Sequence, residues 1–174
     1  MRQRVIWSLF VWMGLLGLAG PAAADDLPRE AVLPVASALK AAQAALDKCV
    51  KDGWKVSVAV VDRAGVLRAQ LRGDGAGPHT VDSSRKKAYT AASLKRTTSE
   101  LGELLGKAPH LQALREMNDS TLILGGGMPI EIGGEVVGGI GVGGAPGTQY
   151  DDACAQAGLE AVGAASKLPA PKER

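Results

Sequence analysis

Two pairs of short runs with the character of strands, each pair joined by a tight turn, constrain the fold of this chain most strongly. The runs at residues 128–132 and 135–142 are separated only by two glycines, and the runs at residues 55–61 and 66–72 by four residues that end in glycine. Short glycine turns of this kind join neighbouring antiparallel strands. The sequence therefore predicts two β-hairpins and a largely antiparallel sheet.

Segments with helical periodicity surround the hairpins. Apolar residues at residues 35–50 recur with the period of a helix, and two Thr-x-x-acid patterns are typical of helix starts. The expected order is a helix at 35–50, strands at 55–61 and 66–72, a helix at 82–95, a helix capped by Thr97 and Glu100, strands at 120–124, 128–132 and 135–142, and a helix capped by Thr148 and Asp151. This order predicts an α/β (α+β) fold with a five-stranded, largely antiparallel sheet flanked by helices.

The first residues have the three parts of a secretory signal. Arg2 and Arg4 precede an apolar stretch at residues 5–20, and the run of alanines ending at Ala24 supplies an A-x-A cleavage site. A membrane anchor is the alternative, but a spanning helix needs about 20 apolar residues. We expect a signal peptide over residues 1–24, one domain over 25–166 and a flexible tail over 167–174. The mature protein is expected to be periplasmic or secreted, without membrane insertion.

Charge excludes one class of partner. Of the 20 basic and 18 acidic residues, two basic ones lie in the predicted signal, so the mature chain carries 18 of each. A nucleic-acid-binding domain usually has a clear basic excess. We therefore expect no nucleic-acid partner.

Two cysteines, Cys49 and Cys154, remain in the mature chain. A disulfide can persist in an exported protein. Sequence gives no distance between the two residues, so one bridge and two free buried thiols both remain open.

Residues 139–144 fit the pattern G-x-G-x-x-G. In dinucleotide-binding folds this pattern lies in an early βαβ unit, with an acidic residue after the next strand. Here only one further helix follows it. We therefore interpret these glycines as positions of close backbone approach and a flexible turn.

The irregular loop at residues 73–80 is the most promising place for chemistry. Its histidine, His79, lies just before a predicted helix, and a neutral imidazole can ligate haem iron. An exposed histidine without a role is the alternative, and His110 is too far along the chain to pair with it by local spacing. The following helix carries groups that could hold the acid groups and flat ring of a ligand, or simply face solvent: Arg85, Lys86, Lys87 and Tyr89.

Five short blocks occur in order along the chain, at residues 62–65, 72–76, 87–91, 125–130 and 138–144. Together they resemble the successive signatures of the GlcG/HbpS-like haem-binding family, which is related to the C-terminal domain of PduO-type corrinoid adenosyltransferases. The resemblance covers residues 33–165. It implies a profilin-like fold, haem or a related tetrapyrrole as ligand, a homo-oligomer and, for a sensing role, a membrane sensor partner.

The resemblance also indicates a site. The block at residues 87–91 would bring hydroxyl and basic side chains near a haem, and the block at 125–130 would bring Met128 to the edge of a pocket. The Gly-Pro-His-Thr run departs from many relatives and makes His79 a distinctive candidate. The predicted haem-binding set is His79, Thr80, Arg85, Lys87, Tyr89, Thr90 and Met128, with His79 as the iron ligand.

The leading hypothesis is an exported haem-binding protein that acts as carrier, scavenger or sensor accessory, with haem degradation as a further activity within the family. A small-molecule enzyme or accessory factor of glycolate- or corrinoid-type metabolism is the second hypothesis. Against it, Asp62, Asp74 and Glu131 are as easily turn or surface acids as an acid–base pair. The third is a ligand-free oligomeric module that associates through its strand edges.

Overall fold

The computed structural model describes residues 28–165. The chain divides into two units, residues 1–30 and 31–174, and the fold below is that of the second unit. The predicted signal peptide at residues 1–24 and the predicted tail at residues 167–174 lie outside the described residues.

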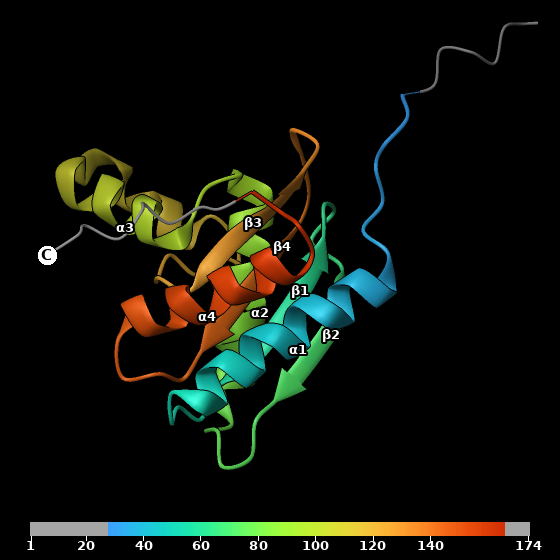
Figure 1. Ribbon diagram of the computed structural model, residues 1–174. Coiled ribbons are helices and arrows are strands. Elements are labelled where there is room, and N and C mark those ends of the chain that lie inside the picture. Colours follow the sequence, from blue (N-terminus) through green and yellow to red (C-terminus); the bar gives the residue numbers. More distant parts are fainter. Residues whose placement is uncertain (1–27, 166–174) are drawn as a thin grey trace, which may run out of the picture. The chain divides into compact units, whose positions relative to one another are not determined.

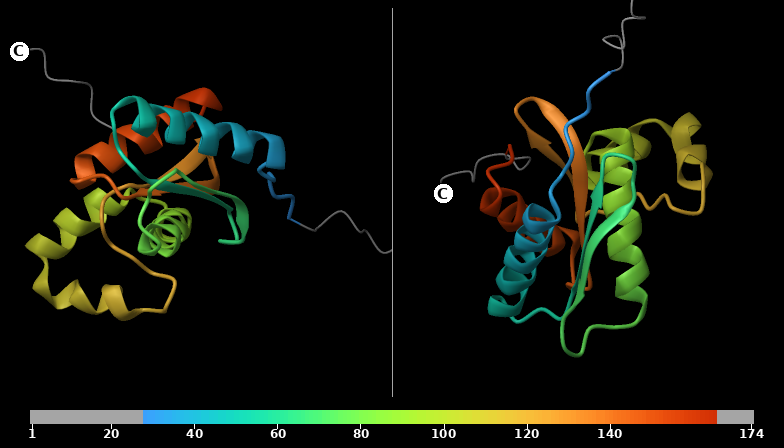
Figure 2. Two further views of the ribbon diagram at one scale, coloured as in Figure 1. Left: turned by 90° about the horizontal axis from the view of Figure 1, so that it is seen from below. Right: turned by 90° about the vertical axis from the view of Figure 1, so that its right-hand side faces the viewer.

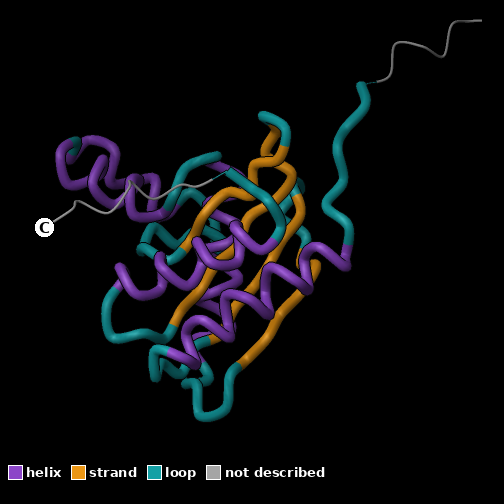
Figure 3. Tube along the Cα trace, in the orientation of Figure 1, coloured by secondary structure: helices purple, strands orange, loops and turns teal. Residues whose placement is uncertain are grey.

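Both predicted hairpins are present and share one antiparallel sheet (Figure 3). The first hairpin is β1 (Ser57–Asp62) with β2 (Leu67–Arg72), and the second is β3 (Gly127–Ile132) with β4 (Glu135–Gly143). The order is β2-β1-β4-β3, and β1 pairs with β4 from Ser57 opposite Gly143 to Asp62 opposite Gly138. The central pair therefore joins strands that are far apart in the sequence.

The sheet of the described region has four strands, because the predicted strand at residues 120–124 is a loop. Its backbone groups bond to side chains instead of to a neighbouring strand. The Leu122 N–H donates to Thr90 Oγ1 at 2.8 Å, and the Arg115 guanidinium donates to the Ile123 carbonyl at 2.8 Å. A segment whose polar backbone groups are satisfied in this way has no need of a strand partner.

Helices cover both faces of the sheet (Figures 1 and 2). One face carries α1 (Val35–Lys51) and α4 (Thr148–Ala161), and the other carries α2 (His79–Leu94). Between α1, α4 and the sheet lies the larger apolar core, which includes Val58, Val60 and Ile140. The expected α+β architecture is thus confirmed. Among the described residues, no helix is long and apolar enough to cross a membrane.

Two further helices, α3 (Thr98–Lys107) and the 3₁₀ helix η2 (Pro109–Glu116), follow α2. The predicted capping box of α3 is present, because the Glu100 N–H donates to Thr97 Oγ1 and the Thr97 N–H donates to the Glu100 carboxylate. The predicted cap of α4 by Thr148 and Asp151 is wrong. Gly147 occupies the N-cap position without a side-chain bond, since Asp151 points inward to other partners.

The glycines of β4 let α2 lie directly on the strand. A Cβ atom at Gly139 would be 2.3 Å from the Ala88 carbonyl oxygen, and one at Gly141 would be 2.1 Å from the Ser84 carbonyl oxygen. Both distances are far shorter than any contact that a real side chain makes. The prediction of close backbone approach is therefore confirmed for these two positions of the G-x-G-x-x-G pattern.

Of the two alternatives for the cysteines, the structure has the bridge. Cys49 of α1 and Cys154 of α4 form a disulfide with a Cα–Cα distance of 5.5 Å, and both residues are fully buried. The disulfide fastens together the two helices that cover one face of the sheet.

Candidate functional site

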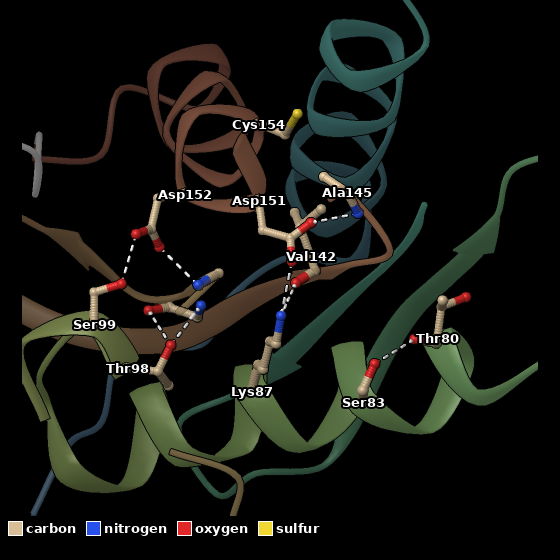
Figure 4. A network of polar contacts seen from close by, with 12 residues as sticks. Thr80, Ser83, Lys87, Thr98, Ser99, Val142, Ala145, Asp151, Asp152 and Cys154 are labelled. Atoms are coloured by element: carbon tan, nitrogen blue, oxygen red, sulfur yellow. Dashed lines mark hydrogen bonds and ion pairs between the residues drawn. The ribbon is translucent and has the colours of Figure 1, made fainter. Parts of the chain in front are cut away.

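A buried ion pair ties α2 to the start of α4 (Figure 4). Lys87 Nζ lies 2.8 Å from Asp151 Oδ2 and donates a second bond, at 2.9 Å, to the Val142 carbonyl of β4. The other carboxylate oxygen of Asp151 accepts the Ala145 N–H at 3.1 Å. The side chains of Lys87 and Asp151 are only 2% and 5% exposed, so the pair is shielded from water.

The next residue, Asp152, holds the glycine loop that leads into β3. Its Oδ1 accepts the Gly126 N–H at 2.7 Å, and its Oδ2 accepts the Ser99 hydroxyl at 2.6 Å. One residue on, the Gly127 N–H donates to Thr98 Oγ1 at 2.8 Å. Residues at the start of α3 and near the start of α4 therefore both hydrogen-bond to the backbone of residues 126–127 (Figure 4).

The loop at residues 125–127 must be glycine for these groups to meet. A Cβ atom at Gly125 would be 2.3 Å from Ser99 Oγ, and one at Gly126 would be 2.5 Å from the Val142 carbonyl oxygen. Gly126 also has a φ of 111°, which side chains rarely allow. The glycines at 125 and 126 thus leave the space that the groups of the polar network occupy.

The network holds one positive and two negative groups, and Lys87 bonds to only one of the two carboxylates. Burial raises the pKa of Asp152, although the bonds from Ser99 and Gly126 and the nearby Lys87 ammonium act to lower it. Burial also raises the pKa of Asp151, against the lowering effect of Lys87. Desolvation is the dominant cause in both cases, because a charged carboxylate loses its hydration when it is buried.

A cavity of roughly 400 Å³ opens beside Asp152. It lies between the first turns of α3, the loop before β3 and the first turn of α4. Its lining residues are Ser99, Gly102, Glu103, Leu124, Gly125, Thr148, Gln149 and Asp152. Sequence reasoning missed this site. The adjacent Asp151 and Asp152 at a helix start were visible in the sequence, but a helix cap explains such acids equally well.

The predicted iron ligand, His79, lies elsewhere, as the first residue of α2. Its side chain is exposed, and its ring lies over the backbone of Gly77, where a Cβ atom would be 2.6 Å from His79 Cε1. Arg72 fixes the preceding loop, because its guanidinium donates to the Ala76 carbonyl from both Nε and Nη2. In the described part of the chain, the imidazole has no hydrogen bond or ion pair, so its nitrogen atoms are available to a ligand.

Four of the other predicted haem contacts are buried and already bonded or packed. Thr80 shares a 2.7 Å hydrogen bond with Ser57, and Thr90 bonds to the Lys86 carbonyl and the Leu122 N–H. Lys87 is in the ion pair described above, and Met128 belongs to the apolar core. In this conformation the four side chains support the fold and do not face a surface ligand.

The remaining two predicted contacts, Arg85 and Tyr89, are half-buried on α2 and contact other parts of the fold. Arg85 pairs with Asp82 at 3.1 Å, and the Tyr89 ring packs on the β1–β2 turn at Gly65. Ten helical residues separate His79 from Tyr89, which corresponds to about 15 Å along the helix axis. The structure therefore does not bring Tyr89 together with His79.

We expect Asp152→Asn to be more stable than the unsubstituted protein at pH 7, because burial raises the pKa of the Asp152 carboxyl and so disfavours its charged form. Asparagine removes the buried charge; its Oδ1 still accepts the Gly126 N–H, and its Nδ2 donates to the Ser99 hydroxyl oxygen, which reverses the direction of that bond. The pKa of Asp152 in the folded protein is raised above its ordinary 3.8. The protonated carboxyl therefore favours the fold at low pH, and this stabilisation is lost as the pH rises through the folded-state pKa and the buried group ionises. The gain should therefore shrink when urea unfolding is repeated near pH 4.

The matched control is Asp82→Asn on the surface. Its carboxyl pKa is lowered, with Lys86 and Arg85 as the lowering groups, so its stabilising contribution is present at neutral pH and is lost on acidification. The two variants should therefore show opposite pH trends. A loss of stability for Asp152→Asn at pH 7 would contradict the assignment of an unfavourable buried charge.

Comparisons with known proteins agree on one family. The family model described as haem degrading protein HbpS-like matches residues 33–160. GlcG from Escherichia coli is 34% identical over 96 residues, which are 55% of this chain and 69% of GlcG. An uncharacterized 15.0 kDa protein from Citrobacter freundii is 34% identical over 66% of this chain and 81% of its own length.

Solved structures share the fold. A double mutant of HbpS from Streptomyces reticuli is 46% identical, with a TM-score of 0.73 over 82% of this chain and 96% of that one. The PduOC–haem complex is 24% identical, with a TM-score of 0.72 over 79% of this chain and all of that one, and shows the likeness of fold alone. On the family match and the likeness to HbpS, this chain belongs to the HbpS-like family, as its sequence blocks predicted.

Proposed function

We propose that this protein binds haem at the loop end of α2, with His79 as an axial ligand of the iron. The observation that carries the proposal is an exposed imidazole at the first residue of α2, just after a fixed loop, with no partner in the described chain, in a protein 46% identical to a double mutant of HbpS. A porphyrin supplies four nitrogen ligands, so its iron needs only one or two from the protein. When bound, haem would supply iron-centred ligand binding or redox chemistry.

Other groups that can hold a flat ligand lie at the same end of the domain as His79. Gly144, Lys55 and Thr80 meet at this end of the domain, since a Cβ atom at Gly144 would be 2.6 Å from the Lys55 carbonyl oxygen and 3.2 Å from Thr80 Cγ2. A hollow of roughly 290 Å³ lies beside the loop and is lined by Val50, Gly53, Trp54, Lys55 and Asp74. The Trp54 ring stands 5.1 Å from that of Tyr150. Aromatic rings and a lysine are groups that can hold a flat ring and its carboxylates.

The test is a haemin titration of the purified domain, followed at the Soret band. We expect saturable one-site binding, weakened at least about tenfold in His79→Ala, which corresponds to 1.4 kcal/mol. His110→Ala is the matched control, because His110 is also exposed but lies on η2. Haem binding that is unchanged in His79→Ala would rule out His79 as the iron ligand. The absence of saturable binding would rule out haem binding as the function.

The same preparation distinguishes a carrier or sensor accessory from a haem-degrading protein. The Soret band of the loaded protein is followed in air with a reductant. A band that returns fully on reoxidation supports a carrier. A band that decays without return, with release of iron, supports degradation.

We further propose that the chain is exported and that residues 1–24 are removed. The buried disulfide between Cys49 and Cys154 supports this proposal, because such bridges persist mainly in oxidising compartments. After expression in a bacterium, the mass of the protein in the periplasmic fraction should correspond to a chain that begins at Asp25. A full-length chain retained in the cytoplasm would contradict export.

A further inference from the structure

The cavity beside Asp152 is separate in sequence and in lining residues from the loop of His79. Its volume of roughly 400 Å³ is within the usual range for small-molecule sites. The only two charged lining residues are acids: Asp152 at its inner wall and the exposed Glu103. The other polar side chains of the lining are hydroxyls and one amide, which can accept hydrogen bonds.

Asp152 forms no direct ion pair within the described chain. The residue is only 7% exposed, and its carboxylate receives two hydrogen bonds, from Ser99 and Gly126. The nearest buried cation, Lys87, bonds to Asp151 and to the Val142 carbonyl instead. A buried carboxylate is costly unless a positive group accompanies it. Each carboxylate oxygen can also accept more than one bond, so Asp152 retains acceptor capacity.

One side of the cavity is shaped by Gly102, in the middle of α3. A Cβ atom there would meet nothing within 4 Å, so no protein contact requires glycine. Glycine inside a helix costs about 0.8–1.0 kcal/mol relative to alanine. The absence of a side chain at this position leaves the cavity open. Leu124, which is 48% exposed, adds an apolar surface.

We propose that this cavity binds a small organic cation, whose ammonium group lies against Asp152 and Glu103 and whose carbon chain packs on Leu124. The ammonium group supplies the direct ion pair that Asp152 does not make with any described residue. An organic cation is favoured over a bare metal ion, because the described residues contain no group of three or more His, Cys, Asp or Glu side chains that could hold a metal, and because Leu124 offers an apolar contact. The proposal does not depend on haem binding.

The test uses n-butylammonium as the probe and butyrate, of the same chain length, as its anionic counterpart. Both are titrated at constant ionic strength into the ¹⁵N-labelled domain. We expect n-butylammonium to shift the amide signals of Gly102 and Gly125 saturably in the millimolar range and butyrate to leave them unchanged. Equal responses to both probes, or no saturable shift with n-butylammonium, would overturn the proposal.

Two variants locate the site. Gly102→Leu places a side chain in the cavity, whereas Gly106→Leu makes the same change one turn along α3, where a Cβ atom also meets nothing within 4 Å and the residue does not line the cavity. We expect Gly102→Leu to abolish the saturable shifts and Gly106→Leu to keep them. Asp152→Asn should weaken n-butylammonium binding at least about tenfold while the fold is kept. Binding that survives both Gly102→Leu and Asp152→Asn would overturn the proposal.

Discussion

Replacing Lys87 with methionine is expected to lower the free energy of unfolding by about 3–5 kcal/mol. Methionine fills a similar volume, so the loss comes from charge and hydrogen bonding. Asp151 would keep a buried negative charge without its partner, and the Val142 carbonyl would lose its donor. A single buried ion left unpaired costs far more than a missing contact. Urea unfolding at pH 7, followed by circular dichroism, measures the loss.

Two comparisons show whether loss of the Lys87–Asp151 ion pair causes the loss of stability. Lys86→Met removes the neighbouring lysine, which pairs with Asp82 on the surface, and should cost no more than about 1 kcal/mol. The double variant Lys87→Met/Asp151→Asn removes both charges and keeps an acceptor for the Ala145 N–H, so it should recover most of the lost stability. A Lys87→Met variant no less stable than Lys86→Met would contradict the structural assignment.

Removing the disulfide should have an effect of similar size. Cys49 and Cys154 are 105 residues apart in the sequence, so the bridge closes a loop that spans most of the domain. A bridge over a loop of this length stabilises a fold by about 4–5 kcal/mol in the chain-entropy model. We expect Cys49→Ala/Cys154→Ala to lower the free energy of unfolding by about 3–5 kcal/mol. The bridge also holds α4, and therefore the Asp151 and Asp152 carboxylates near its start, against α1.

Reduction supplies the control for the disulfide. Dithiothreitol should destabilise the unsubstituted protein by about as much as the double substitution does, and it should leave the double variant unchanged. If dithiothreitol leaves the stability of the unsubstituted protein unaltered under unfolding conditions, the bridge does not form in the protein as isolated.

Local patterns in the sequence determined much of the fold. The hairpins follow from short strand-like runs on either side of tight turns, and the capping box of α3 follows from Thr97 and Glu100, because all of these interactions lie within a few residues. The glycines of β4 were interpretable as positions of close approach, since a glycine without a turn usually indicates a nearby backbone. Five ordered blocks were enough to indicate the family.

Residues 120–124 show where local patterns fail. Their β-branched and apolar side chains are typical of a strand, but their backbone groups bond to Thr90 and Arg115, which sequence cannot place beside them. The candidate site is a similar case. Helical spacing puts Lys87 on the same side of α2 as Ala91. A lysine is buried only where a carboxylate lies close to it, and the carboxylate here, Asp151, is 64 residues away in the sequence. Local patterns therefore could not predict the burial of Lys87.

The sequence by itself thus determined most of the elements, the antiparallel pairing within each hairpin and the family, because these depend on neighbouring residues and on short ordered blocks. Only the tertiary structure decided that β1 pairs with β4, that Cys49 meets Cys154 and that Asp152 is buried beside an open cavity with no direct ion pair to any residue between 28 and 165. The physical reason is that a side chain's charge balance is set by its neighbours in space. For Asp152, those neighbours come from α2, α3 and the loop before β3.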